Sequence, residues 1–156
     1  MTISLRDELP ADDSFLRSLI VDHVAAQLGA AAWPEPLRSQ LLGIQYTSRR
    51  DSIRTSFPDH RSRIIQIDGA DAGWLVTADL PADYRLVEII LVPEFRSRGA
   101  GAEVVDIVLR EATRKPVRLS VDTANPAAIR LYERLGFRRI GGDEVRHTME
   151  RPARPL

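Results

Sequence analysis

The sequence predicts one α/β domain, built as a mixed sheet with helices on both faces, and three observations support this prediction. Its 156 residues are 44% hydrophobic and 28% charged, which is enough apolar material for one buried core. Strand-favouring runs occur in pairs both early and late in the chain, as in antiparallel hairpins. Between these pairs, strands alternate with amphipathic helices, as in crossover connections. The domain should cover residues 1–150, and residues 151–156, with two prolines, should form a loose tail.

The first part of the chain contains a strand and two helices. A short strand fits residues 3–6. Apolar residues at helical spacing then predict a helix over residues 14–28, which ends at Gly29. A second helix begins at Pro34 or Pro36, because a missing amide proton is harmless in a first helical turn. Its apolar residues are Leu37, Leu41, Ile44 and Tyr46.

Hairpins and crossovers make up the rest of the chain. Residues 63–67 and 73–78 flank an Asp-Gly pair, which is a strong hairpin signal. A third strand fits residues 84–92, and apolar positions along one face predict a helix over residues 102–114. The remaining elements are a strand at 117–121, a helix at 126–135 ended by Gly136, and strands at 137–140 and 145–149.

Composition excludes several classes of protein. Lysine plus arginine equals aspartate plus glutamate at 22 each, so no net positive field attracts nucleic acid or an anionic membrane. The chain has no cysteine, which excludes disulfides and thiolate catalysis and fits a reducing compartment. No apolar run is long enough to span a bilayer, and the charged first residues do not resemble a secretory signal. We therefore expect a cytoplasmic protein without nucleic-acid or membrane partners.

The most informative segment joins the end of one predicted strand to the start of the next helix. A helix N-terminus offers unpaired amides and a positive dipole end, and glycine allows an anion to approach closely. The segment is therefore a plausible pyrophosphate site, although a tight turn would need the same glycines. A dinucleotide-binding fold is a poor match, since Val104 occupies the third glycine position and too little chain follows Asp122. The residues concerned are Arg96, Ser97, Arg98, Gly99, Ala100, Gly101 and Ala102.

A second motif lies around the helix at residues 126–135. Asn125 is a good N-cap, and Ala128 and Tyr132 share one face of the helix. Spacing alone favours Tyr132 as a core residue with a satisfied hydroxyl over a catalytic one. Taken together, Arg96-x-x-Gly99-x-Gly101 and Asn125-x-x-Ala128-x-x-x-Tyr132-x-x-x-Gly136-Phe137 resemble the signature motifs of the GNAT superfamily of acetyl-CoA-dependent N-acetyltransferases.

The resemblance implies a fold, a co-substrate and a set of roles. The fold would be a mostly antiparallel twisted sheet of about six or seven strands, and the co-substrate would be acetyl-CoA. In such proteins the glycine loop binds the pyrophosphate, and amides of the preceding strand hold the pantetheine arm. Those amides match Ile89, Leu91 and Val92, and the motif asparagine, which contacts the same arm, matches Asn125. Tyr132 would protonate the departing thiolate.

The general base is less well defined by the sequence. Glu88 is the only carboxylate in residues 86–92, and a buried glutamate with a raised pKa suits this role. Strand alternation, however, directs Glu88 away from the face on which related proteins often hold their base, unless a β-bulge restores it. His147 is a second candidate, and a structural role remains open for both. His23 and His60 have no partners at metal-ligand spacing, so no metal is expected.

The acceptor should be a small amine or an amino-acid-like molecule. Residues 34–63 contain six arginines against three acids, and an arginine there could bind a carboxylate or phosphate on the acceptor. The alternative is a solvated charged face. The predicted acceptor-binding residues are Trp33, Tyr46, Arg49 and Arg50. A homodimer is compatible with the sequence. The competing function is an acyl-CoA-binding module of the same fold with little or no turnover.

Overall fold

The computed structural model describes residues 1–153 and contains one seven-stranded sheet in the order β1-β2-β3-β4-β5-β7-β6. Only β4 and β5 pair in parallel, and all other neighbours are antiparallel. This arrangement confirms the predicted fold class and element order. The strands are β1 (Ile3–Asp7), β2 (Arg61–Ile67), β3 (Ala70–Asp79), β4 (Tyr84–Leu91), β5 (Val117–Asp122), β6 (Arg138–Gly142) and β7 (Arg146–Arg151).

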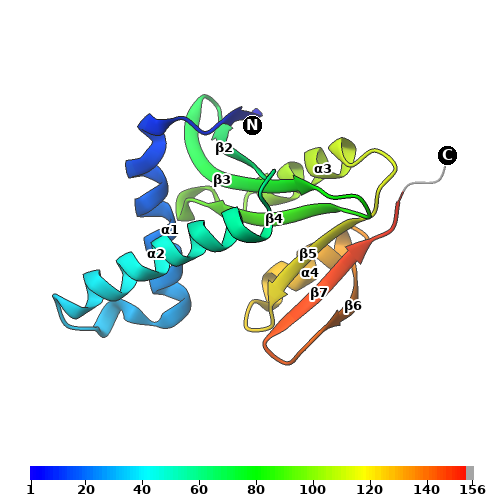
Figure 1. Cartoon of the computed structure of the whole chain (residues 1–156). Helices are drawn as coiled ribbons and strands as arrows, with labels where there is room; N and C mark the ends of the chain where they lie inside the picture. The colour runs from blue at the N-terminus through cyan, green and yellow to red at the C-terminus, as the bar shows by residue number, and fades with distance from the viewer. Residues whose placement is uncertain (154–156) are drawn as a thin grey trace.

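Helices cover both faces of the sheet (Figure 1). Helices α1 (Asp13–Leu28) and α2 (Leu37–Ser56) enclose one apolar cluster, which includes Trp74 and Ile90 from the sheet. Helices α3 (Ala100–Glu111) and α4 (Pro126–Arg134) pack on the opposite face. Three short 3₁₀ turns complete the structure, at Pro10–Asp12, Ala30–Ala32 and Pro93–Phe95.

Several element ends differ from those expected. Strand β7 continues to Arg151, which pairs with Val117, so the first residue of the expected tail belongs to the sheet. Residues 152 and 153 follow it without regular structure, and 154–156 lie outside the described residues. Helix α3 begins at Ala100 and ends at Glu111, each a few residues earlier than predicted. The hairpin turn is tighter than expected, because Asp68 and Gly69 alone connect β2 to β3, both with positive φ.

Of the four apolar residues that the sequence indicated for the inner face of α2, only Tyr46 is buried. Leu37, Leu41 and Ile44 are 48%, 37% and 61% exposed, whereas Leu42, Tyr46 and Ile53 are buried. The helix has two apolar stripes, and only one can meet the sheet. The stripe through Leu42, Tyr46 and Ile53 runs to the C-terminal half, which crosses the sheet, while the N-terminal half extends past it (Figure 1).

Two features of β4 prepare the site. Parallel pairing with β5 involves only Tyr84–Leu86 and Val117–Leu119, so the later part of β4 has an edge that no strand covers. In addition, Thr77 pairs with Leu86 but Val76 pairs with Glu88, which leaves Val87 as an extra residue in a β-bulge. The bulge turns both Val87 and Glu88 toward α1 and α2, so alternation alone gave the wrong face for Glu88.

Candidate active site

Three adjoining cavities follow the uncovered edge of β4, and we call them together the wedge. The inner chamber, of about 100 Å³, lies beside Glu88 and Tyr132. A middle cavity of about 300 Å³ lies along Ile89 and Leu91, and an outer groove of about 340 Å³ reaches the glycine loop. Tyr132 lines both the inner and the middle cavity. A continuous path therefore leads from the start of α3 to the bulge of β4.

The edge of β4 presents backbone amides to the wedge. The amide of Val92 donates to the carbonyl oxygen of Ala72 on β3, at 2.8 Å. Because successive peptide groups of a strand point to opposite edges, the amides of Ile89 and Leu91 point away from β3. Arg96 Nε donates to the Leu91 carbonyl oxygen at 3.0 Å, which agrees with this direction. Of the three predicted amides, Ile89 and Leu91 are thus available, and that of Val92 is not.

The glycine loop forms an open N-terminus for α3. Gly99 is the N-cap in the left-handed region, with φ of 82°, and nothing lies within 4 Å of where its Cβ would be. The first intrahelical bond runs from Glu103 to Gly99, so within residues 1–153 the three amides from Ala100 to Ala102 have no partner. An anion at this helix end would meet free donors and the positive end of the helix dipole.

The predicted loop residues divide into two groups. The outer groove is lined by Arg96, Ser97, Gly99, Gly101 and Ala102. The side chain of Ala100 is instead buried in the core beneath α3, so only its backbone faces the helix end. Arg98 is exposed and lines none of the three cavities. Its predicted contact with the cofactor is therefore not supported by its position.

Helix α4 places two of the predicted residues in the wedge. Asn125 Oδ1 accepts a hydrogen bond from the Ala128 amide at 3.2 Å, as its N-cap position predicts. Its side chain also lines the inner and middle cavities, while Ala128 lines the inner chamber and the outer groove. The structural and functional interpretations of Asn125 are therefore compatible, because one oxygen caps the helix and the amide nitrogen remains for a ligand.

The Tyr132 side chain is 8% exposed. Its ring packs edge-on against Phe137, with centroids 5.6 Å apart, but its hydroxyl has no hydrogen-bond partner among residues 1–153. Burial, with a smaller contribution from Glu88, raises the pKa of the phenol to about 12. The site thus holds a neutral phenol whose proton is committed to no protein group, which disfavours the alternative of a satisfied core tyrosine.

Glu88 lines the inner chamber with Tyr132. Its Oε1 accepts a hydrogen bond from Arg49 of α2 at 3.1 Å, and the two side chains are 22% and 24% exposed. Burial raises the pKa of the Glu88 carboxyl, although the charges of Arg49 and Arg146 act against this shift. A carboxylate with a raised pKa beside an unpartnered phenol is a suitable pair for proton transfer.

The structure adds residues that sequence reasoning missed. His23, Gln27 and Arg146 all line the inner chamber. Burial and the charges of Arg49 and Arg96 lower the pKa of the His23 imidazole to about 4, so it is neutral near pH 7. Helical spacing in the sequence could have indicated two of the polar residues of this chamber. His23 continues the buried stripe of α1 that contains Leu16 and Ile20. Arg49 lies between the buried residues Tyr46 and Ile53 of α2. A polar residue at the spacing of a core stripe points to the same side of the helix as that stripe.

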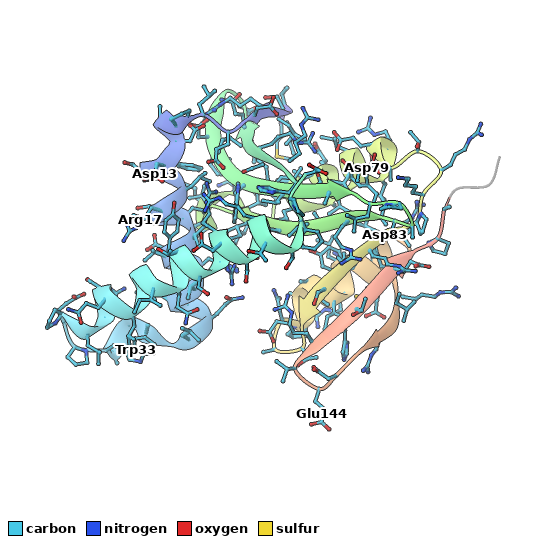
Figure 2. The ribbon with its side chains drawn as sticks, in the orientation of Figure 1. Asp13, Arg17, Trp33, Asp79, Asp83 and Glu144 are labelled. Atoms are coloured by element: carbon cyan, nitrogen blue, oxygen red, sulfur yellow. The ribbon has the colours of Figure 1, made fainter. Side chains whose placement is uncertain are left out.

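Three of the four predicted acceptor-binding residues do not line the wedge. Arg50 forms a two-pronged pair with Glu8, at 3.0 and 2.7 Å, and covers the ring of Trp74. Tyr46 is buried, and its hydroxyl donates to Asp13 Oδ1 at 3.1 Å. Trp33 lies in the connection between α1 and α2, away from the wedge (Figure 2). Arg49 alone lines the wedge, so the arginine-rich segment contributes one side chain rather than a binding surface.

The other candidate groups lie outside the wedge. His147 pairs with Val121 in the sheet and lines none of its three cavities, which weighs against its role as the base. Within residues 1–153, no group of three or more His, Asp or Glu side chains is arranged to hold a metal ion. Over the same residues, no helix has both the length and the apolar character needed to cross a membrane.

Comparison with known proteins identifies the family. Residues 25–137 match the Acetyltransferase (GNAT) family, and the chain therefore belongs to it, as the two motifs indicated. An uncharacterised protein of Mycobacterium leprae is 38% identical over 61 residues, which are 39% of this chain but only 17% of that protein. The chain thus spans a small part of this curated relative.

Solved structures with the same fold cover nearly the whole chain. The PaiA N-acetyltransferase of Thermoplasma acidophilum, in complex with coenzyme A, is 17% identical with a TM-score of 0.69, covering 97% of this chain and 99% of that one. The spermidine N-acetyltransferase of Vibrio cholerae, in complex with coenzyme A and spermine, is 16% identical with a TM-score of 0.62, covering 95% and 92%. At these identities the similarity establishes the fold.

Proposed function

We propose that this protein is an N-acetyltransferase that moves an acetyl group from acetyl-CoA to the primary amine of a small molecule, by direct attack in a ternary complex. The observation that supports this most strongly is the wedge itself. An uncovered strand edge leads from unpartnered amides at the start of α3 to an unpartnered hydroxyl on Tyr132. Membership of the acetyltransferase family and the coenzyme A held by two structural neighbours agree with this assignment.

The wedge suits acetyl-CoA along its whole length. The amides of Ala100, Gly101 and Ala102 would bind the pyrophosphate, with the Arg96 guanidinium nearby as a charged donor. The edge amides of Ile89 and Leu91 would hold the pantetheine arm by strand-like hydrogen bonds. When bound, acetyl-CoA supplies an activated acetyl group as a thioester.

The first chemical requirement is an uncharged amine. An amine with a pKa near 10.4 costs about 4 to 5 kcal/mol to deprotonate at pH 7, so a nearby base contributes substantially. Glu88 is placed for this role, because it lines the inner chamber beside Tyr132 and burial raises the pKa of its carboxyl. Glu88 takes the proton of the ammonium and passes it to solvent. The uncharged nitrogen then attacks the thioester carbonyl carbon, the carbon–sulfur bond breaks, and Glu88 accepts the second proton that the nitrogen loses.

The second requirement is stabilisation of the departing sulfur. Tyr132 would donate a hydrogen bond from its hydroxyl to the thiolate. Because the pKa of this phenol is about 12 and an ordinary thiol has a pKa of about 8.5, the proton stays on the phenol. Tyr132 therefore stabilises the departing sulfur as a hydrogen-bond donor, and coenzyme A leaves as the thiolate while the amine's proton passes to Glu88 and from there to solvent.

A thiol-release assay tests the proposal. Purified protein is mixed with acetyl-CoA and each member of a panel of primary amines, and free coenzyme A is measured together with the acetylated product by mass spectrometry. We expect thiol release in proportion to the acetylated amine for at least one class of acceptor. If acetyl-CoA binds in calorimetry and no amine is acetylated, the acyl-CoA-binding module is the correct function.

A further inference from the structure

The inner chamber contains two arginines besides the groups to which the proposed reaction assigns a role. Every element around Glu88 contributes a polar group to it. These groups are His23 from α1, Arg49 from α2, Asp122 from β5, Tyr132 from α4 and Arg146 from β7, with Arg96 at its outer side. His23 is neutral near pH 7, and Asp122 accepts the Ala124 amide at 2.8 Å. Two guanidinium groups and two carboxylates therefore line a space of about 100 Å³, and only the pair between Arg49 and Glu88 is in direct contact.

The contact between Arg49 and Glu88 differs from the one that the adjacent Arg50 makes with Glu8. Arg49 donates a single hydrogen bond to Glu88, from Nη1 at 3.1 Å. Its Nη2 donates a longer hydrogen bond, of 3.4 Å, to Gln27 Oε1. By contrast, Arg50 holds Glu8 with two bonds of 3.0 and 2.7 Å. A guanidinium that uses one donor on its partner can present its other edge to an incoming anion.

Arg146 stands on the other side of the chamber with unused donors. Its Nε donates to Ser120 Oγ at 2.9 Å, and its Nη2 donates to the Ser120 carbonyl oxygen at 3.2 Å. No carboxylate lies within ion-pair distance of it among residues 1–153. Arg146 is exposed to solvent, and a solvent-accessible arginine at the mouth of a cavity, without an acidic partner, can bind an anionic ligand.

The same pairing limits Glu88 as a base. Arg49 donates to Oε1 only, so a proton can bind Oε2, but the charge of Arg49 favours the ionised carboxylate, and protonation would leave this guanidinium beside a neutral acid. Turnover is favoured when another anion takes over Arg49. The acceptor can supply that anion if it carries one.

We propose that the acceptor is a small amine that carries its own carboxylate or other monoanionic group, which binds Arg49 and Arg146 and thereby releases Glu88 to accept the amine proton. This inference rests on the proposed acetyl transfer and specifies its acceptor. In the step that follows, the amine nitrogen forms the bond to the acetyl carbon, the carbon–sulfur bond breaks, and the nitrogen's proton passes to Glu88. Arg49 then has two functions, since it binds the anion of the acceptor and controls when Glu88 can accept a proton.

The first test compares matched acceptors with the wild-type protein. Each pair consists of an amino acid and the amino alcohol in which a hydroxymethyl group replaces the carboxylate, for both α- and ω-amino acids, with spermidine as a polyamine. Rates are compared per unprotonated amine. One charge-assisted contact is worth about 10- to 100-fold in affinity, so kcat/KM should favour the amino acid by at least about 10-fold in the best pair.

The second test uses Arg49→Gln, with Arg54→Gln as its control. Both substitutions remove one charge from α2, but Arg54 is exposed and pairs only with Asp51. In Arg49→Gln the preference should fall at least several-fold, because KM rises for the amino acid, which Arg146 alone then binds, and stays unchanged for the amino alcohol. In Arg54→Gln the preference should remain. Arg49→Lys should lie between them, since it retains the charge and loses the fork.

A pH profile separates the release of Glu88 from simple anion binding. The charge of Arg49 acts to lower the pKa of Glu88. When the carboxylate of the acceptor binds Arg49, the acidic limb of the pH profile of kcat should therefore move to higher pH. In the wild type this limb should therefore lie higher with the amino acid than with the amino alcohol, and in Arg49→Gln the two limbs should coincide.

If the wild-type protein gives equal kcat/KM for the amino acid and the amino alcohol of every pair, the inference is wrong. This test uses only the wild-type protein, so it does not depend on whether a variant folds. An unchanged preference in Arg49→Gln would also overturn the inference. In either case acetylation of neutral amines would leave the proposed function standing. Absence of thiol release with every amine would instead refute the proposed function itself.

Discussion

Replacing Tyr132 by phenylalanine removes one oxygen from the wedge and leaves the rest of the side chain in place. The ring would keep its edge-on contact with Phe137 and its place in the core cluster. Because the hydroxyl has no partner among residues 1–153, its removal leaves no buried donor or acceptor unpaired. We therefore expect the free energy of unfolding to change by less than about 1 kcal/mol.

The expected effect on catalysis is much larger. If Tyr132 donates to the departing thiolate, its loss removes an interaction made chiefly in the transition state, and kcat should fall about 10- to 1000-fold. This corresponds to about 1.4 to 4 kcal/mol of barrier. The affinity for coenzyme A should change little, since the Ala100–Ala102 amides and the β4 edge are untouched.

Three measurements on the same preparation decide whether Tyr132 is catalytic. Thermal or denaturant unfolding reports stability, calorimetry reports the affinity for coenzyme A, and steady-state thiol release reports kcat. A variant with wild-type stability, wild-type affinity and reduced kcat supports the assignment. A variant that retains wild-type kcat refutes it and makes Tyr132 a packing residue.

Three further predictions concern the cofactor loop, the base and the sheet. Gly99→Glu places a carboxylate at the start of α3 and strains a residue with φ of 82°, so calorimetry should show coenzyme A affinity reduced at least about 10-fold; unchanged affinity in a folded variant would exclude this site. Glu88→Gln should lower kcat about 100-fold and remove the acidic limb from the pH profile of kcat. In the wild type this limb should lie above the usual carboxyl range, because the pKa of Glu88 is raised. An acidic limb that persists in the variant would belong to another group. Gly73→Ala should destabilise the fold by about 1 to 3 kcal/mol in denaturant unfolding, because its Cβ would lie 2.4 Å from the Ile90 carbonyl oxygen. Gly141→Ala, with nothing within 4 Å, is its control and should be tolerated, and equal stability of the two would contradict the packing argument.

The architecture was accessible from sequence because local signals agreed with one another. Gly29 occupies the left-handed position after α1, as its place behind an apolar periodic run indicated. Asp68 and Gly69 form the expected hairpin turn. Asn125 and Pro126 begin α4 as an N-cap and first-turn pair would. Each of these features depends on a few neighbouring residues, so no knowledge of distant contacts was needed.

The details of the site depend on contacts between distant segments and were not accessible in the same way. Arg49 and Arg50 are adjacent, yet one faces Glu88 and the other holds Glu8, and only the rotation of α2 on the sheet decides which. Likewise, the bulge at Val87 sets the direction of Glu88, and no glycine or proline marks it in the sequence. His23 on α1 and Arg146 on β7 are far apart in the sequence, and only the fold brings them to the same chamber.

The position of acetyl-CoA in a crystal structure of the complex tests the central claim most directly. The account predicts the pyrophosphate against the amides of Ala100–Ala102, the pantetheine arm bonded to the amides of Ile89 and Leu91, and the thioester sulfur within about 3.5 Å of the Tyr132 hydroxyl. Acetyl-CoA bound outside the wedge, or a sulfur beyond hydrogen-bond reach of Tyr132, would contradict it.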